Sequence, residues 1–521
     1  MKRKILLTAL LALPLLAATG VNPKNGNFYI TYNDMVLTRE GHSLEITRTY
    51  NSKSTEIGWF GYGWGSKYET QLIVLPDGSA VIKENGNGRA SYYRTRDATV
   101  VQAGVQRIVA AASLQDKLSD AEGQALAAKL LKDEELRLTT TLKYHITSEL
   151  LAGSELEDDC GRGTLTRVPE GYSRQDCNLF GDTEQATDTF DHEGHLVRHA
   201  LASGYAVSVA YSGDSVSEIR DTLGQKFELT RAISGHVASV TTGDKSSKYD
   251  YLGDDLVRNE ESDGNTYRYA YDNQHNLTRV TYVDDSSLFI SYSPRFNGMA
   301  DAFTERSGDQ QTYVYHTDPQ DANHYWTTRT DVSASGSTRT KEYEYQNQTG
   351  ATGVTQPSRV AQGDGSNAVE TKFDDKGRVI RKANSSGGFV EYVYDKRSDK
   401  LVRVLENQQS TSFRYDAEGN LVQAANSNGK LIVLRYDRSK LIQTMVVSQR
   451  GAARRELTFK YNAGGRPTEI KLTGKGQIQV DYGADGEITD ISSSQGSNMA
   501  LQVTEIFQDL LSIVSVAGAK F

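Results

Sequence analysis

The 521-residue sequence is poor in cysteine and has no surplus of positive charge. Two cysteines exclude a fold held by a dense disulfide framework. The formal net charge of -9 argues against a nucleic-acid-binding surface, which would cluster Lys and Arg. The chain also lacks G-x-S-x-G, H-E-x-x-H and the phosphate-binding G-x-x-x-x-G-K motif. We therefore expect no enzyme activity, no catalytic residues, no cofactor and no metal.

The only long apolar run stands at the N-terminus, MKRKILLTALLALPLLAATG. Lys2, Arg3 and Lys4 form a cationic region, an apolar run follows, and small residues precede Val21, which predicts a signal peptide over residues 1–20. The run is short for a membrane span, so no transmembrane segment is expected after cleavage. An uncleaved N-terminal anchor is the alternative. The predicted location is outside the inner membrane: periplasm, cell surface or extracellular space.

The two cysteines, Cys160 and Cys177, are expected to form a disulfide in an oxidising compartment. Closing a loop of this length contributes about 3 kcal/mol in the chain-entropy model. A two-cysteine metal site is the competing interpretation, but no histidine stands at ligand spacing.

A repeated sequence motif fills most of the chain. It consists of an aromatic residue, then Asp or Asn, then Gly or Asn three residues later, and usually an aliphatic residue after that. YDAEGNLV, which begins at Tyr415, is one example. Successive aromatic anchors are mostly 20 or 21 residues apart, a period typical of repeat architectures. The predicted anchors are Phe190, Tyr211, Tyr251, Tyr271, Tyr292, Phe373, Tyr394, Tyr415, Tyr436, Tyr461 and Tyr482.

Each repeat is predicted to be two strands joined by a bulged hairpin. Residues before each anchor alternate with period two, as in Tyr267, Tyr269 and Tyr271, which indicates a strand with one buried face. Asp416 can bond nearby backbone and Gly419 can take a positive φ, which suits the turn. We expect the aromatic rings to form a cross-strand ladder rather than ligand platforms, at about 0.2–1 kcal/mol per pair.

Two segments predict helices. Ser119 or Asp120 can cap a helix with Glu122 in its first turn, within a segment over residues 101–150. The tail places Val503, Ile506 and Phe507 at helical spacing and can also cover a sheet edge. The predicted parts are a signal peptide at 1–20, an N-terminal β segment at 21–95, a helical insert with the disulfide loop at 96–188, a β array at 189–490 and a helical tail at 491–521.

The tyrosine-aspartate repeats resemble those of the Rhs/YD-repeat family. The N-terminal segment resembles the family independently: G-N-F before Asp34, then Arg48-x-Tyr50-Asn51-Ser52, then G-x-G-W ending at Trp64. The resemblance covers about three quarters of the chain. It implies a mainly β fold, a long antiparallel meander that curls or forms a partial shell, and roles in toxin encapsulation, cell-surface contact or carbohydrate binding. The D-P-x-G-L self-cleavage motif and the variable toxic domain of larger relatives are absent from this sequence.

The aromatic residues Trp59, Phe60, Tyr62 and Trp64 allow two interpretations, a sugar-stacking surface or a packed plug at the start of the sheet. Together these features predict a secreted, non-enzymatic scaffold that contacts an envelope protein or a glycan. The alternatives are a shell or chaperone for a separately encoded toxin, and a glycan hydrolase with two carboxylates about 5–9 Å apart.

Overall fold

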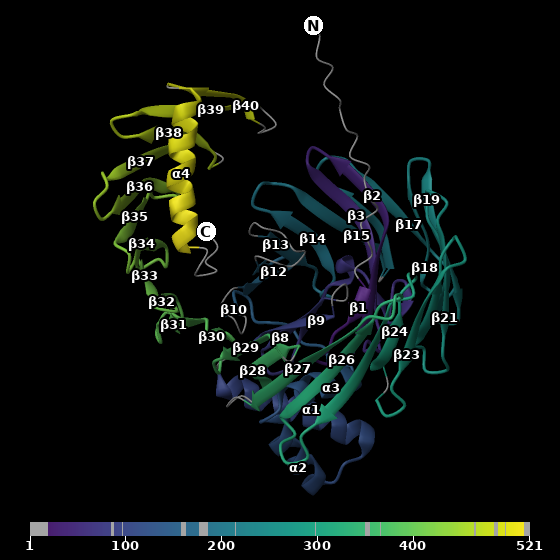
Figure 1. The fold of residues 1–521 in the computed structure, drawn as a ribbon. Coiled ribbons are helices and arrows are strands. Elements are labelled where there is room, and N and C mark those ends of the chain that lie inside the picture. Colours follow the sequence, from purple (N-terminus) through teal and green to yellow (C-terminus); the bar gives the residue numbers. More distant parts are fainter. Residues whose placement is uncertain are drawn as a thin grey trace. The chain divides into compact units, whose positions relative to one another are not determined.

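The computed structural model describes residues 19–84, 88–95, 97–157, 163–176, 186–213, 215–296, 298–349, 355–364, 366–462, 465–483, 488–494 and 496–514. Within them, strands β10 to β40 follow one another in sequence order through a 31-stranded antiparallel sheet (Figure 1). The predicted mainly β meander is confirmed. The chain divides into two compact units: unit 1 extends to Ser358 and takes Gln362–Gly365 and Asp375–Gly377, and unit 2 comprises Arg359–Ala361, Ser366–Asp374 and Arg378–Phe521.

The elements before the large sheet are β1 Thr19–Val21, β2 Phe28–Arg39, β3 His42–Asn51, β4 Ile57–Gly58, β5 Gly61–Tyr62, β6 Trp64–Gly65, a 3-10 helix Lys67–Glu69, β7 Gln71–Val74, β8 Ala80–Glu84, β9 Arg89–Tyr93, α1 Ala98–Asp116, α2 Asp120–Leu130 and α3 Glu134–Lys143. The sheet then runs through β10 Glu155–Glu157, β11 Thr164–Val168, β12 Gly171–Asp176, β13 Ala186–Phe190, β14 Leu196–Leu201, β15 Ala206–Ser212, β16 Ser215–Asp221, β17 Lys226–Arg231, β18 Val237–Thr242, β19 Lys245–Leu252, β20 Asp255–Glu260, β21 Thr266–Tyr271, β22 Leu277–Thr281, β23 Ser287–Tyr292, β24 Ala300–Thr304, β25 Gln310–Thr317, β26 His324–Val332 and β27 Thr338–Thr349.

The remaining elements are β28 Thr355–Gly363, β29 Ala368–Phe373, β30 Val379–Asn384, β31 Phe389–Tyr394, β32 Leu401–Glu406, β33 Gln409–Tyr415, β34 Leu421–Asn426, β35 Lys430–Tyr436, β36 Ile442–Gln449, β37 Arg455–Tyr461, β38 Pro467–Leu472, β39 Gly476–Tyr482, β40 Ile488–Ser493 and α4 Ser497–Val514. Strands β26, β27 and β28 are 9, 12 and 9 residues long, which accounts for the loosened anchor spacing between Tyr292 and Phe373.

The repeat turn has the predicted chemistry. In the hairpin of β33 and β34 the register shifts between Arg414 and Tyr415, which marks a bulge at the anchor. The Asp416 carboxylate accepts the main-chain N–H of Asn420 at 2.8 Å, and Gly419 has a φ of 88°. Because a positive φ costs glycine little, the chain reverses here without strain. Where the glycine is replaced, as at His275 and Lys440, φ is still positive.

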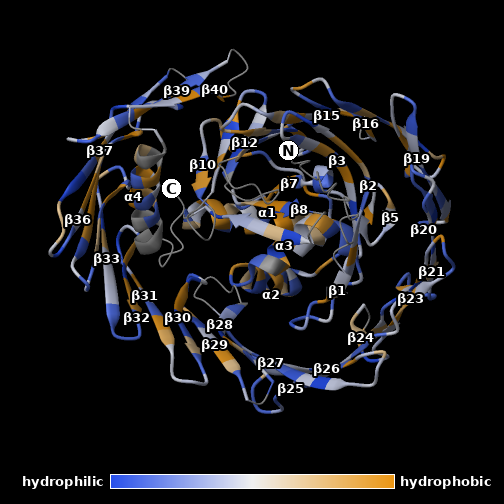
Figure 2. Ribbon diagram, turned by 45° about the horizontal axis from the view of Figure 1, so that its top comes forward, coloured by the Kyte–Doolittle hydropathy of each residue, from blue (hydrophilic) through white to orange (hydrophobic). Residues whose placement is uncertain are grey.

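The N-terminal segment, residues 19–95, packs in unit 1 against one face of the sheet. We call this the inner face; it is formed in β16–β25 by residues such as Ile219, Phe227, Leu256 and Phe303, all buried. Phe28, Ile30 and Tyr32 of β2 alternate toward it and belong to the same core. The strands alternate between hydrophobic and hydrophilic residues (Figure 2), so a covered inner face opposes a polar outer face.

The predicted insert is only partly helical. Helix α2 begins where the sequence predicts, with Ser119 as N-cap and Glu122 completing a capping box. Helix α1 precedes it and is capped by Asp97. Strands β10, β11 and β12, however, already belong to the large sheet. The sheet therefore begins at Glu155, earlier than the predicted array boundary at residue 189. The predicted boundary lies too late because these short strands lack the repeat motif.

Unit 2 has its own core, formed by the sheet and helix α4. Val503 and Ile506 are buried against strands that include β34 and β39, and Phe507 contacts Phe459 at a ring distance of 6.0 Å. The tail therefore covers a face of the unit 2 sheet. The helix also contacts edge strand β40, in which Ile488 and Ile491 stay more than half exposed.

Candidate functional site

The aromatic anchors act through their hydroxyl groups. Each predicted tyrosine anchor donates to a main-chain carbonyl of the preceding repeat, at the residue that resumes the strand after the preceding turn. The pairs are Tyr211 to Leu196, Tyr251 to Val237, Tyr271 to Leu256, Tyr292 to Leu277, Tyr394 to Val379, Tyr415 to Leu401, Tyr436 to Leu421, Tyr461 to Ile442 and Tyr482 to Pro467, at 2.7–3.1 Å. We call these bonds tyrosine tethers.

The tethers explain why the repeat uses tyrosine more often than phenylalanine. A ladder of stacked rings would need no hydroxyl group. A tether needs a tyrosine hydroxyl that keeps its proton, because the hydroxyl donates the hydrogen bond. Burial raises the pKa of Tyr436 to about 12, with the Asp416 carboxylate adding to the shift, so the phenol keeps its proton. Phe190 and Phe373 are anchors without a hydroxyl; Phe190 is buried. The sequence revealed the spacing of the anchors but not the carbonyls that they reach.

A buried ion pair joins the N-terminal segment to the inner face. Arg48 Nε lies 2.8 Å from Asp34 Oδ2 and 3.0 Å from Asp34 Oδ1, and both side chains have no exposed surface. Arg48 Nη2 donates to Asn259 Oδ1 at 3.0 Å and to the Tyr269 hydroxyl at 2.7 Å. The Tyr249 hydroxyl donates to Asp34 Oδ2 at 2.7 Å. We call these five residues the arginine lock.

The lock depends on a bulge in β2. The register of β2 on β3 shifts between Asn33 and Met35, so Asp34 and Met35 both point inward. Burial raises the pKa of the Asp34 carboxyl, and the neighbouring Arg48 cation lowers it. The sequence carries a signal for this pair, because a charge stands at an inward position in each strand: Asp34 after Tyr32, and Arg48 after Ile46.

Aromatic rings surround the Arg48 guanidinium. Its central carbon lies 4.6 Å from the ring centre of Tyr32, 4.7 Å from that of Trp64 and 5.3 Å from that of Tyr269. Cation–π contacts of desolvated cations contribute up to about 2 kcal/mol or more each. The Trp64 indole N–H also donates to the hydroxyl of anchor Tyr271 at 2.9 Å, so one tether is bonded to the N-terminal segment.

The other predicted aromatic residues also contact the sheet. Phe60 is buried and packs on Tyr249 at a ring distance of 5.0 Å. Tyr62 is half-buried beside His275 at 4.8 Å, and Trp59 packs against the same core. This packing favours the plug interpretation of Trp59, Phe60, Tyr62 and Trp64, because a sugar-stacking surface needs ring faces open to solvent.

A second ionic cluster joins the N-terminal segment to the first repeats. Arg174 of β12 is fully buried between Asp188 Oδ2 at 2.9 Å and Glu84 Oε1 at 3.1 Å. His199 Nδ1 lies 2.7 Å from Asp188 Oδ1. Both clusters place buried charges between the N-terminal segment and the large sheet, so the N-terminal segment is an integral part of unit 1.

Two carboxyl groups have strongly raised pKa values, as a general acid would need. Burial raises the pKa of Glu69 to about 8, although the main-chain N–H groups of Trp59 and Ser66 donate to its carboxylate and lower the pKa. Burial, followed by the charge of Asp34, raises the pKa of Glu261 to about 8. Neither lines the hollow described next, so their pKa values reflect packing.

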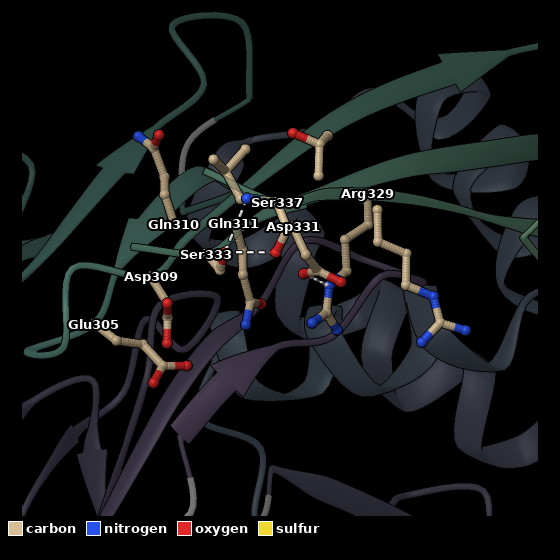
Figure 3. A pocket seen from close by; sticks show the side chains of 11 residues that line it. Glu305, Asp309, Gln310, Gln311, Arg329, Asp331, Ser333 and Ser337 are labelled. Atoms are coloured by element: carbon tan, nitrogen blue, oxygen red, sulfur yellow. Dashed lines mark hydrogen bonds and ion pairs between the residues drawn. The ribbon is translucent and has the colours of Figure 1, made fainter. Parts of the chain in front are cut away.

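The described residues of unit 1 form a shallow hollow of about 300 Å³ at the turn ends of β24–β27 (Figure 3). Glu305, Asp309 and Asp331 line it. Asp331 is paired with Arg329 at 2.6 Å. Asp309 accepts the main-chain N–H of Ala334, the main cause that lowers the pKa of Asp309. The lowered pKa of Asp309 does not suit acid catalysis at neutral pH.

Other histidine and aspartate side chains form pairs at turns, where their role is structural. His195 is held by Asp191, and Asp254 and Asp255 pair with His236 and His275. Among the described residues, no group of three or more His, Cys, Asp and Glu side chains is placed to hold a metal ion. In the same part of the chain, no helix combines the length and hydrophobicity that a bilayer crossing requires.

Two predictions fall mainly on residues that the structure does not describe. Cys160 and Cys177, the predicted disulfide, lie outside the described residues. So do residues 1–18 of the predicted signal peptide, whereas Thr19 and Gly20 form part of β1 and pair with Ile30 and Tyr29.

The comparisons with known proteins begin at the N-terminal segment. A family model described as a domain of unknown function, DUF6531, matches residues 18–93. No curated protein matches the chain.

Among solved structures, TcdB2-TccC3 without its hypervariable C-terminal region is 10% identical, with a TM-score of 0.33, over 90% of this chain and 28% of that one. The Photorhabdus luminescens Tc holotoxin pore with a TccC3-D651A mutation is 9% identical, with a TM-score of 0.23, over 89% of this chain and 33% of that one. A porin-like protein from Bacteroides uniformis is 12% identical, with a TM-score of 0.11, over 56% of this chain and 93% of that one.

This chain thus spans about a third or less of the two toxin chains that it resembles. The protein is a β meander whose N-terminal segment matches the DUF6531 model, and its resemblance to the Rhs/YD-repeat family stays a prediction.

Proposed function

We propose that this protein is an exported, non-enzymatic scaffold of the Rhs/YD-repeat type that acts at the cell envelope through the outer face of its sheet. One observation carries the proposal: in each unit, one sheet face is packed by the chain itself. The N-terminal segment covers β16–β25 in unit 1, and α4 packs on the sheet of unit 2. The opposite face is the surface that each unit leaves for contact with other molecules.

The composition of the outer face supports a contact role. Its residues include Arg220 and Glu218, Lys226 and Glu228, and Arg258 with Asp250 and Glu260, which form exposed ion pairs. Such pairs contribute only about 0–1 kcal/mol each to stability. Their side chains can exchange partners at low cost, as a surface that contacts polar envelope components requires.

The same packing favours a scaffold over a shell that encloses a separately encoded toxin. Cargo would need the apolar inner faces, and these already contact Phe28, Ile30 and Trp64 in unit 1 and Ile506 in unit 2. Asp331 of the hollow is paired with Arg329 and Asp309 accepts the main-chain N–H of Ala334, which disfavours the glycan hydrolase. Export is supported by the cationic and apolar N-terminus.

Cell fractionation and an activity assay together test the proposal. A C-terminally tagged full chain, expressed in a Gram-negative host, should be recovered outside the cytoplasm with its N-terminus at Val21, as read by N-terminal sequencing. The purified protein should release no reducing ends from a panel of envelope polysaccharides. Cytoplasmic retention would overturn the envelope role, and reducing-end release that Asp331→Asn abolishes would establish the hydrolase instead.

A further inference from the structure

Strand β40 is an open edge of the unit 2 sheet (Figure 1). One side of β40 pairs with β39, and no strand of the described residues pairs with its other side. The sequence of β40, ITDISS, contains neither lysine nor proline, which edge strands commonly use to prevent pairing with another chain. The main chain of this edge can therefore accept a further strand.

The two isoleucines of β40 occupy positions that are core positions in an earlier hairpin. Ile488 pairs with the anchor of its own hairpin, as Leu401 does in the hairpin of β31 and β32, and Ile491 occupies the position of Val404. Leu401 and Val404 are buried, whereas Ile488 and Ile491 are 54% and 59% exposed. The difference follows from the neighbours, because β32 has a strand on each side and β40 has one within the described residues.

The main-chain groups of Ile491 point to the open edge. The Ser494 N–H donates to the Gln477 carbonyl of β39 at 3.0 Å. In an antiparallel pair, the main-chain groups of every second residue point to the same neighbour, so those of Ser492 also point to β39. The N–H and C=O of Ile491 then point away from β39, where an added strand would find one donor and one acceptor.

A second copy of β40 fits this edge in the antiparallel direction. When Ile491 faces the same residue of the second copy, each N–H can donate to the other C=O, which makes a two-fold symmetric pair. In this register Asp490 lies opposite Ser492, so no like charges face each other directly. The opposite edge of the large sheet, β10, is a poorer partner, because its exposed Glu155 and Glu157 would bring carboxylates beside Asp490.

We propose that two copies of this chain associate through their β40 edges, in an antiparallel strand pair centred on Ile491. The pair would join the unit 2 sheets of the two copies and bring the two Ile491 side chains together on the inner face. The inference goes beyond the proposed function and does not depend on it, because the edge is open whether or not the chain is exported.

Sedimentation velocity of the purified full chain, at about 1 to 100 µM, tests the association. We expect a monomer–dimer equilibrium. Ile491→Pro removes an N–H that only a partner strand would use, and proline is tolerated at such edge positions. Because two-fold symmetry removes two hydrogen bonds at once, the dimer should weaken by about tenfold or more. Ile491→Lys, which places two like charges at the centre of the pair, should weaken it as well.

Val393→Lys is the matched control. Val393 is an exposed aliphatic residue of β31, and β31 has a paired strand on each side. A lysine at this position should therefore leave the dimerisation constant unchanged. Circular dichroism must show that each variant keeps the strand content of the wild type.

Disulfide trapping tests the register independently of those variants. On oxidation, Ile491→Cys should form a covalent dimer in non-reducing electrophoresis, well above the background that the two native cysteines give in the wild type and in Val393→Cys. A chain that stays monomeric over the whole concentration range, or folded Ile491→Pro and Ile491→Lys variants that dimerise like the wild type, would overturn the inference. Oligomers that grow beyond the dimer would also overturn it, because they require head-to-tail contacts.

Discussion

Replacing Arg48 by methionine isolates the energetic contribution of the arginine lock. The substitution keeps a long apolar stem but removes the cation from a site where both Arg48 and Asp34 are fully buried. Asp34 then retains the Tyr249 hydroxyl as its side-chain donor, and Asn259 and Tyr269 lose the donor that they share. Removing one partner of a buried ion pair leaves an uncompensated charge, which costs about 3–5 kcal/mol. We expect the free energy of unfolding of unit 1 to fall by that amount.

Tryptophan fluorescence during urea unfolding measures this loss selectively. The three tryptophans, Trp59, Trp64 and Trp326, all lie in unit 1, so their emission reports that unit. Circular dichroism at the strand band reports both units. The fluorescence transition should therefore shift to lower urea in Arg48→Met, while the part of the dichroism transition that belongs to unit 2 stays in place.

Two further variants make the reasoning refutable. Adding Asp34→Asn to Arg48→Met removes the orphaned charge and should restore about 2 kcal/mol, because a neutral amide can still accept from Tyr249. Arg258→Met breaks exposed ion pairs on the outer face and should cost less than about 1 kcal/mol. A fluorescence shift in Arg48→Met no larger than that in Arg258→Met would show that the lock does not hold the segment to the sheet.

Three other substitutions test separate features. Tyr436→Phe removes one tether and should lower the free energy of unfolding of unit 2 by about 0.5–1.5 kcal/mol, as measured by circular dichroism. An unchanged unfolding transition would mean that water replaces the hydrogen bond without a loss of stability. Ile506→Ala, in the buried stripe of α4, should lower the free energy of unfolding of unit 2 by about 2–5 kcal/mol and leave the tryptophan fluorescence transition unchanged. A shift of the fluorescence transition would contradict the division into two units. Because the pKa of Glu261 is raised to about 8 in the folded protein, its stabilising contribution is complete below its ordinary value near 4.5 and is lost as the pH rises through 8. Glu261→Gln should therefore flatten the decline in stability between pH 5 and 8, whereas the outward-facing Glu260→Gln should not; parallel profiles for the wild type and Glu261→Gln would exclude this residue as the cause.

The sequence predicts the repeat well because each hairpin is determined locally. Asp416 and Gly419 specify the turn within five residues, and alternation around Tyr415 specifies the buried face, so strand, turn and bulge follow from neighbours in the chain. Helix α2 was predictable for the same reason, since its capping box spans Ser119 to Glu122.

The long-range features were not predictable from spacing. Tyr249, Asn259 and Tyr269 meet Arg48 across more than 200 residues, and nothing in the repeat distinguishes these positions from their equivalents in other repeats. The sequence does not indicate the start of the sheet at Glu155, because β10–β12 lack the tyrosine-aspartate motif.

The direction of the tyrosine tethers has a consequence for biogenesis. In every tether the accepting carbonyl precedes the donating hydroxyl by 14 to 19 residues. During synthesis from the N-terminus, each newly emerging hairpin finds its acceptor already in place, with the N-terminal segment available as the first template. Folding can then advance in the order of synthesis, one hairpin at a time, with little need for contacts between residues far apart in the sequence.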